Sequence, residues 1–449
     1  MTRPPAAVTR PPAAVPALTA PRRARRLSVA ERTLESGLRV LAVRRAGVPL
    51  VELRLRVPFA GRASTHSARA NLLAYTLLSG TRELSTVDIA VALQRIGGGL
   101  NVDANPDRLL VTGNALAGGL PQLLEILGDV LTGASYPGSE VTGERDRLVE
   151  RLLRARSQPA VIAREALLHR LFGEHPYAGE IPRAEAVGSV TAAQLRSLHR
   201  TRLLPAGSTL VLVGDVAPAR ALDRVESALS GWAGEGRAQP APAVPALQRG
   251  PIVVVDRPEA VQSNLRVAGA ALARQHPDYA AMQLANLVFG GYFSSRLVEN
   301  IREDKGYTYS PHCVIEHSAA GSNVVLEADV ATAVTAPALM EVRYELSRIA
   351  TLPVDEEELQ SARQYAIGTL ALSTATQAGL ASMLTALLAS GLGPEWLQQH
   401  AQRLAGVTVA EVREQAARFL APSHLVTVVV GDASIIGPEL ATLDEVSAG

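Results

Sequence analysis

The sequence predicts an α+β fold of two homologous α/β-sandwich domains that arose by internal duplication. The apolar run 209–213 closes on Gly-Asp, and so does the apolar run 425–430. Each run follows a stretch of helical period that carries Val-Thr near its start, at 190–191 and at 407–408. Such matched stretches, about 200 residues apart, indicate that one structural unit has been repeated.

A segment rich in Pro, Ala and Gly, 234–250, separates the halves and has the composition of a linker. The N-terminal domain is therefore expected at 29–233 and the C-terminal domain at 251–449. Residues 1–28 contain Thr-Arg-Pro-Pro-Ala-Ala-Val twice and no acidic residue, a composition that cannot bury a core. We expect a disordered tail there, and it lacks the apolar stretch of a secretory signal.

The elements of the first half follow in order along the chain. Residues 37–43 and 51–57 alternate apolar and polar side chains, which is the period of half-buried strands. A short apolar helix is predicted over 70–78. Residues 93–116 are predicted to form a helix end, a glycine loop and two strands. Pro106 belongs in the turn between those strands, because proline cannot donate a ladder hydrogen bond.

Composition excludes several classes of function. The chain has 449 residues, enough for two domains with full cores. It is 47% hydrophobic, but it has no apolar run of about 18 residues, so we expect no membrane span. A net charge of +1 predicts no strong attraction to nucleic acid or acidic lipid. The single cysteine, Cys313, excludes an intrachain disulfide and suits a reducing compartment, so a cytoplasmic location is expected.

One helix resembles a metal-binding helix whose ligands have been replaced. Ala70–Thr81 (ANLLAYTLLSGT) is similar to the zinc helix of the pitrilysin/insulinase-type metallopeptidases, whose pattern is His-x-x-Glu-His, an apolar stretch and Gly-Thr. In that family the two histidines hold zinc and the glutamate is the general base. By this resemblance Asn71 and Tyr75 stand at the histidine positions and Ala74 at the glutamate position. The third ligand position falls on Arg151, which is always charged and cannot bind a cation.

A second resemblance lies in the other half. Residues 287–311 (LVFGGYFSSRLVENIREDKGYTYSP) are similar to the family's second-half signature of Gly-Gly, Ser-Ser-Arg-Leu, a helix ending in Arg-Glu, and Gly-x-x-Tyr. The resemblance implies that Arg302 holds a substrate carbonyl and that Tyr309 donates to the oxyanion formed during hydrolysis. The alternatives are a surface salt bridge of Arg302 with Glu299 or Glu303, and a half-buried strand position for Tyr309.

The residues around this pair are predicted to be structural. Gly290 and Gly291 should allow a tight turn, and Ser294 or Ser295 should cap the following helix. Arg296 should anchor the start of that helix.

Together the two resemblances imply the zinc-free subunit of a heterodimeric peptidase. Two-subunit bacterial peptidases related to mitochondrial processing peptidase divide the zinc motif and the facing residues between two chains. This chain resembles the zinc-free one: half of a clamshell, without a cofactor of its own, that acts on a peptide with a zinc-bearing homologous partner. The alternative is an inert structural or peptide-binding homologue, like the core subunits of the respiratory cytochrome complex.

A third possibility is an active enzyme whose metal site has moved to other histidines. His169 with His175 and His312 with His317 are the pairs to consider. Neither pair has the spacing of four that shares a helix face, so the sequence disfavours this possibility.

The family's active half also binds peptide along a strand edge by β-augmentation. The resemblance places that substrate-binding edge at Leu100, Asn101, Val102, Asp103, Ala104 and Asn105. Without zinc beside it, such an edge would hold a peptide without cutting it. The alternative is an ordinary edge strand.

Overall fold

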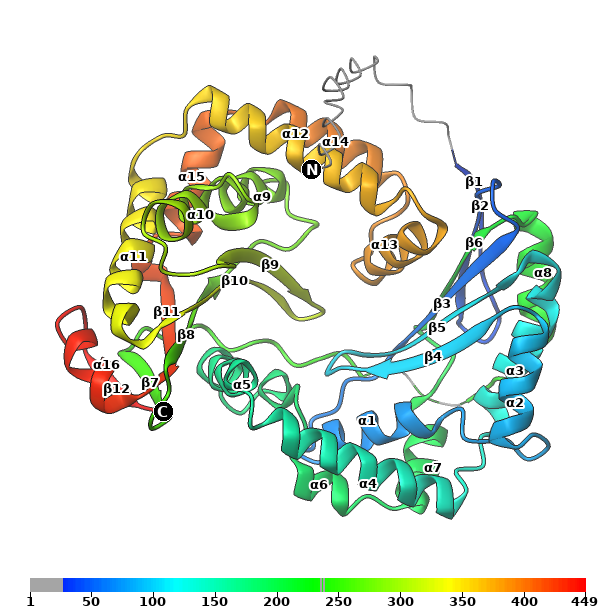
Figure 1. Ribbon diagram of the computed structural model, residues 1–449. Coiled ribbons are helices and arrows are strands. Elements are labelled where there is room, and N and C mark those ends of the chain that lie inside the picture. Colours follow the sequence, from blue (N-terminus) through cyan, green and yellow to red (C-terminus); the bar gives the residue numbers. More distant parts are fainter. Residues whose placement is uncertain (1–26, 235, 237–238) are drawn as a thin grey trace, which may run out of the picture.

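Two halves with the same plan face each other across a concave interior (Figure 1). The computed structural model describes residues 27–234, 236 and 239–449. Most of the predicted tail, 1–26, lies outside these residues, and Ser28 is already the first residue of strand β1. Each half contains one six-stranded sheet with helices packed against it, which agrees with the predicted pair of α/β sandwiches.

The first sheet has the strand order β1-β2-β6-β3-β5-β4. β2 and β6 pair in parallel, and the other neighbours pair antiparallel. β6 is buried along its whole length, as predicted for a central strand. The strands are β1 (Ser28–Thr33), β2 (Arg39–Arg44), β3 (Leu50–Pro58), β4 (Gly99–Ala104), β5 (Arg108–Leu116) and β6 (Thr209–Gly214).

The second sheet has the equivalent order β12-β7-β11-β8-β10-β9. β7 pairs in parallel with β11, as β2 does with β6, and the edge strand β9 takes the place of β4. The strands are β7 (Ile252–Asp256), β8 (Gln262–Ala270), β9 (His312–Ser318), β10 (Gly321–Ala331), β11 (Leu425–Gly431) and β12 (Val446–Ala448).

The register of the two halves confirms the internal duplication. In the first half a helix begins at residue 66, and the two strands that follow begin at 99 and 108. The equivalent elements of the second half begin at 279, 312 and 321, an offset of 213 in each case. A constant offset across one helix and two strands indicates two copies of one unit.

Helices pack on both sheets. The first half contains α1 (His66–Thr76), α2 (Thr86–Arg95), α3 (Leu120–Gly133), α4 (Gly138–Ala155), α5 (Pro159–Phe172), α6 (Ala184–Gly188), α7 (Ala192–Arg202) and α8 (Pro218–Ala228). The second half contains α9 (Tyr279–Asn286), α10 (Arg296–Val298), α11 (Thr335–Thr351), α12 (Glu356–Ser373), α13 (Gln377–Ala389), α14 (Trp396–Gly406), α15 (Val409–Phe419) and α16 (Ala433–Leu440). Across the described residues, no single helix has the length and apolar character to cross a membrane; α12 and α13 pass only as a pair bent by 108°.

The repeated Val-Thr pair has a structural cause. Thr191 is the N-cap of α7 and forms a capping box with Gln194. Thr408 is the N-cap of α15 and forms the same box with Glu411. In each box the threonine oxygen accepts from a first-turn N–H and the long polar side chain accepts from the cap N–H, so the helix start is defined locally.

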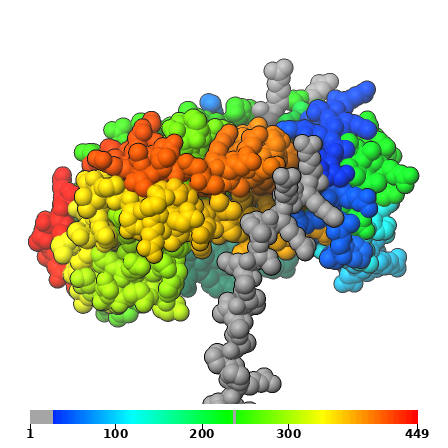
Figure 2. Space-filling model, turned by 90° about the horizontal axis from the view of Figure 1, so that it is seen from above, coloured from blue at the N-terminus to red at the C-terminus, as the bar shows by residue number. Residues whose placement is uncertain are grey.

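One helix of each half packs against the sheet of the other half. α5 packs against β8 and β11 of the second sheet, where Leu167 and Val428 share a buried cluster. α13 packs against β3 and β6 of the first sheet, where Leu384 and Val211 share another. From above, the orange helices of the second half reach the blue strands of the first (Figure 2). Two separate apolar clusters therefore join the halves.

Polar contacts join the tips of the two edge hairpins. Asp107, in the turn between β4 and β5, accepts hydrogen bonds from the Ala319 N–H (2.8 Å) and the Tyr177 hydroxyl (2.5 Å). Arg164 on α5 donates to both carboxylate oxygens of Glu316 on β9, at 2.9 and 3.0 Å. These contacts bring edge strands β4 and β9 end to end.

Candidate functional site

The positions that match the zinc ligands do come together in space, but without ligand groups. Tyr75 on α1 and Arg151 on α4 face each other, with the guanidinium carbon 4.2 Å from the ring centroid. Asn71 donates its amide N–H to the Ser67 carbonyl of its own helix (2.9 Å). Ala74 is buried. The site therefore holds a cation–π contact where a metal would need imidazole and carboxylate groups.

Nothing in the described chain replaces the lost site. No group of three or more His, Cys, Asp or Glu side chains in the described residues has the geometry to hold a metal ion. His175 Nε2 lies 3.1 Å from the Pro242 carbonyl, and His317 Nδ1 lies 2.8 Å from the Ser322 hydroxyl. Those histidines satisfy neighbouring structural groups, which argues against a relocated metal site.

Arg302 and Tyr309 line one hollow of about 740 Å³ on the second half. The Arg302 guanidinium carbon lies 4.7 Å from the Phe293 ring centroid and 5.0 Å from that of Tyr309. Its Nε lies 3.2 Å from a Glu303 carboxylate oxygen. The predicted pair is thus assembled side by side, with the guanidinium held by two rings and one carboxylate.

The two structural alternatives fare differently. The salt bridge of Arg302 with Glu303 is present, and it leaves the two terminal amino groups of Arg302 without a hydrogen-bond partner among the described residues. Tyr309 is 81% exposed and precedes β9, so the half-buried strand position is wrong. Phe293 was not identified from sequence; the signal would have been an aromatic residue two positions after Gly-Gly.

The local backbone is unusual where it carries this pair. Leu287–Gly291 and Glu299–Asp304 are both π-helical, and single-turn π-helices are frequent at functional sites. The predicted tight turn at Gly290 and Gly291 is wrong, because both residues lie inside the π-helix Leu287–Gly291. Close packing explains why both positions are glycine. A Cβ on Gly290 would lie 3.0 Å from Cys313 Cβ, and a Cβ on Gly291 would lie 2.8 Å from a Leu287 methyl group.

Two further predictions about this segment have clear outcomes. Ser295 does occupy the N-cap of α10, but its hydroxyl is buried and makes no hydrogen bond within the described structure, so it caps by backbone position only. Arg296 is structural, as predicted. Its Nε and one amino group donate to the two carboxylate oxygens of Glu358 at 2.7 and 2.6 Å, and the side chain is only 6% exposed.

The two candidate regions do not share a cavity. The hollow around Arg302 is lined only by residues of the second half, between 262 and 331. A hollow of about 960 Å³ beside the first turn of α1 contains Asn71 and is lined only by residues between 61 and 186. Arg302 and Tyr309 therefore line a different hollow from the one that contains Asn71 of the degenerate zinc motif.

The predicted peptide-binding residues lie on and just after edge strand β4. Asn101 is exposed and Val102 is buried in the core. Asn105 lies beyond the strand, and its side-chain oxygen accepts from the N–H groups of Asp107 and Arg108, both at 3.0 Å. Asn105 thus shapes the turn, and Gly99–Ala104 is the part that offers an unpaired edge.

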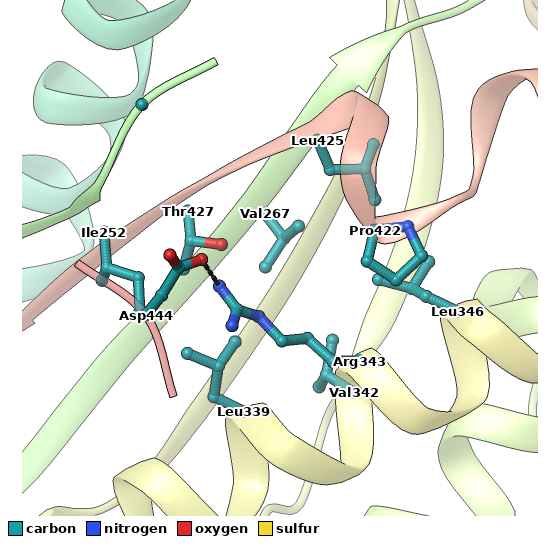
Figure 3. Close-up of a pocket in the computed structure, with 11 residues that line it drawn as sticks. Ile252, Val267, Leu339, Val342, Arg343, Leu346, Pro422, Leu425, Thr427 and Asp444 are labelled. Atoms are coloured by element: carbon teal, nitrogen blue, oxygen red, sulfur yellow. Dashed lines mark hydrogen bonds and ion pairs between the residues drawn. The ribbon is translucent and has the colours of Figure 1, made fainter. Parts of the chain in front are cut away.

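A cavity under α11 is too small to be a binding site. It measures about 50 Å³, and its lining includes Val267, Leu339 and Leu346 together with Arg343 and Asp444, which form an ion pair at 2.8 Å (Figure 3). Such a volume holds a water molecule or two.

Family comparisons agree with this geometry. The model described as Insulinase (Peptidase family M16) matches residues 66–185, and the model described as Peptidase M16 inactive domain matches residues 189–365. The two matches together cover more than half of the chain. This chain belongs to peptidase family M16. The predicted resemblance is confirmed.

Individual M16 relatives are distant. An uncharacterized zinc protease of Mycobacterium leprae is 26% identical over 298 residues, 65% of this chain and 67% of that protein. The non-peptidase homolog YmxG of Helicobacter pylori is 23% identical over 313 residues, 68% of this chain and 71% of that protein. Human mitochondrial-processing peptidase subunit beta is 22% identical over 267 residues, 58% of this chain and 53% of that protein. The chain thus spans about two thirds of the length of the first of these relatives.

A solved structure confirms the M16 fold. The peptidase M16 inactive domain from Pseudomonas fluorescens superimposes with a TM-score of 0.81 at 22% identity, over 90% of this chain and 98% of that one. The fold class predicted from sequence is therefore correct.

Proposed function

We propose that this chain is the zinc-free subunit of a heterodimeric M16 peptidase and supplies Arg302 and Tyr309 to the zinc site of a homologous partner subunit. One observation carries the proposal: both side chains line a single open hollow, while the chain's own metal positions hold no ligand. A human relative is named as one subunit of a processing peptidase, which supports a partnered arrangement.

Each residue has a defined chemical task in this proposal. The two terminal amino groups of Arg302 are left to donate to a substrate carbonyl, because Nε is directed at Glu303. The exposed Tyr309 hydroxyl donates a hydrogen bond to the carbonyl oxygen that becomes negative during attack. This hydrogen bond should contribute more to the rate than the Arg302 contact does. The partner's zinc supplies the activated water.

The edge of β4 is proposed as the place where this chain holds peptide. Gly99–Ala104 is the last strand of its sheet and presents unpaired N–H and C=O groups along one side. An extended peptide can add to such an edge as a further strand. The substrate would then be a peptide or a small unfolded protein, since only an extended chain pairs in this way.

The test uses the assembled complex of both chains. Tyr309→Phe should leave assembly and zinc content intact and lower kcat by roughly 10²–10³, as loss of one oxyanion donor does elsewhere. Arg302→Ala should raise KM as well as lower kcat, because it removes a contact to bound substrate. The matched control is Tyr344→Phe, which changes an exposed tyrosine on α11 outside the hollow. The complex with this variant should cleave at the wild-type rate.

An inert structural or peptide-binding homologue is the competing function. The relative named as a non-peptidase homolog favours it. If complexes with Tyr309→Phe and Arg302→Ala cleave peptide as fast as wild type, this competing function is correct.

A further inference from the structure

The degenerate metal site still presents a positive charge. Arg151 takes the third ligand position and rests on the ring of Tyr75, which takes a histidine position, at 4.2 Å. The two side chains are 45% and 44% exposed, so the guanidinium is held in place and still reachable from solvent.

We propose that Arg151, positioned on Tyr75, binds a carbonyl or carboxylate oxygen of an extended peptide that lies along β4. This inference rests on the peptide-binding edge described under the proposed function, and it does not depend on a partner subunit. It assigns to the altered residues a binding role in place of a catalytic one.

The arrangement of the elements supports this assignment. Helix α1, which carries Tyr75, packs against both the edge strand β4 and helix α4, which carries Arg151. We therefore expect a peptide paired with β4 to pass beside the guanidinium. In an edge-paired peptide, alternate carbonyl groups point away from the sheet edge and are free to accept such a hydrogen bond.

The donors of Arg151 are available to a ligand. Arg151 makes one loose ion pair, with Glu144 Oε2 at 3.8 Å, which is beyond hydrogen-bond distance. The other oxygen of Glu144, Oε1, accepts from Arg147 at 2.7 Å. The Tyr75 ring covers a face of the guanidinium and makes no demand on its N–H groups. Glu150 pairs with Arg154 at 3.8 Å on the same helix.

The chemistry of arginine explains binding without cleavage. A guanidinium is planar, remains charged at every physiological pH and offers paired N–H donors to a carboxyl or carbonyl oxygen. It cannot lower the pKa of a bound water molecule as a metal does. A peptide bound here is consequently held intact.

The experiment measures binding of a short fluorescein-labelled unstructured peptide to the isolated full-length chain by anisotropy. Arg151→Gln should weaken binding about ten-fold, the effect of losing one charged hydrogen bond. Tyr75→Leu should weaken it in the same direction, whereas Tyr75→Phe keeps the ring and should match wild type. Arg154→Gln, 76% exposed on the same helix, is the matched control and should also match wild type.

Two probe peptides separate the possible ligand groups. Equal loss with a free and an amidated C-terminus assigns the contact to a main-chain carbonyl, and loss confined to the free acid assigns it to the terminal carboxylate. Either result supports the site. Equal affinities for Arg151→Gln and Arg154→Gln, or no measurable binding by the wild-type chain, overturn it.

Val102→Pro, in a variant verified as folded by circular dichroism, tests the edge separately. Unchanged affinity there, together with weaker binding by Arg151→Gln, would reject pairing with β4 while retaining the arginine contact. Loss of affinity in both variants supports the whole arrangement.

Discussion

Acid should destabilise the second half of the chain through the buried His400 and the half-buried His317. His400 is only 3% exposed, stacks on Trp396 with ring centroids 4.1 Å apart, and donates from Nε2 to the Gln283 side-chain oxygen at 2.8 Å. His317 lies nearby, 3.2 Å from the Tyr279 hydroxyl, and the Tyr279 ring also stacks on His400. Protonation would place charge inside this aromatic cluster.

The sign and size of the effect follow from the pKa values. Burial lowers the pKa of both His317 and His400 to about 4, and the positive charge of Arg274 acts in the same direction on both. The unfolded chain takes up these protons near pH 6.5, so stability is fully present above that pH and is lost as pH falls toward 4. Each histidine should account for roughly 3 kcal/mol of the free energy of unfolding across this window.

The assay is urea-induced unfolding of wild type and His400→Gln at pH values between about 7 and 4. The glutamine cannot titrate, so the stability of the variant should fall less steeply with pH. The difference between the slopes of wild type and variant should be about 1.4 kcal/mol per pH unit. Leu404→Ala, at a fully buried position on the same helix, is the control. It should lower the whole curve and keep the wild-type slope. Identical slopes for wild type and His400→Gln would refute the reasoning.

Three other predictions concern metal and ion pairs. The purified chain, reloaded with zinc after chelator treatment, should contain no stoichiometric zinc and cleave no peptide; a one-to-one zinc content with activity would contradict the assignment. The quadruple variant Asn71→His, Ala74→Glu, Tyr75→His and Arg151→Glu should regain zinc binding, measured by metal analysis, because Tyr75 and Arg151 already lie in contact. If this variant folds but takes up no zinc, the alignment or the supporting shell is wrong. Glu358→Gln should cost about 3 kcal/mol of stability in urea unfolding, because it leaves the buried Arg296 charge unpaired; a change below about 1 kcal/mol would show that water compensates the charge.

Features set by neighbouring residues were predictable from the sequence. The strand at 209–214 and its counterpart at 425–431 follow from apolar runs that end in Gly-Asp. The helix starts at Thr191 and Thr408 follow from caps that act within one turn. The loss of zinc ligands is likewise local, since a ligand is defined by its side chain and its place on a helix.

Features that depend on distant contacts required the tertiary structure. The exchange of α5 and α13 between the halves joins apolar faces that are far apart in sequence, and the pattern of an apolar face does not name the surface that covers it. The stacking of Tyr75 on Arg151 and the contact of Phe293 with Arg302 also depend on how separate elements pack. The sequence thus determined which groups this protein can use, and the packing decided which of them meet, because side-chain chemistry is local and proximity is a property of the whole fold.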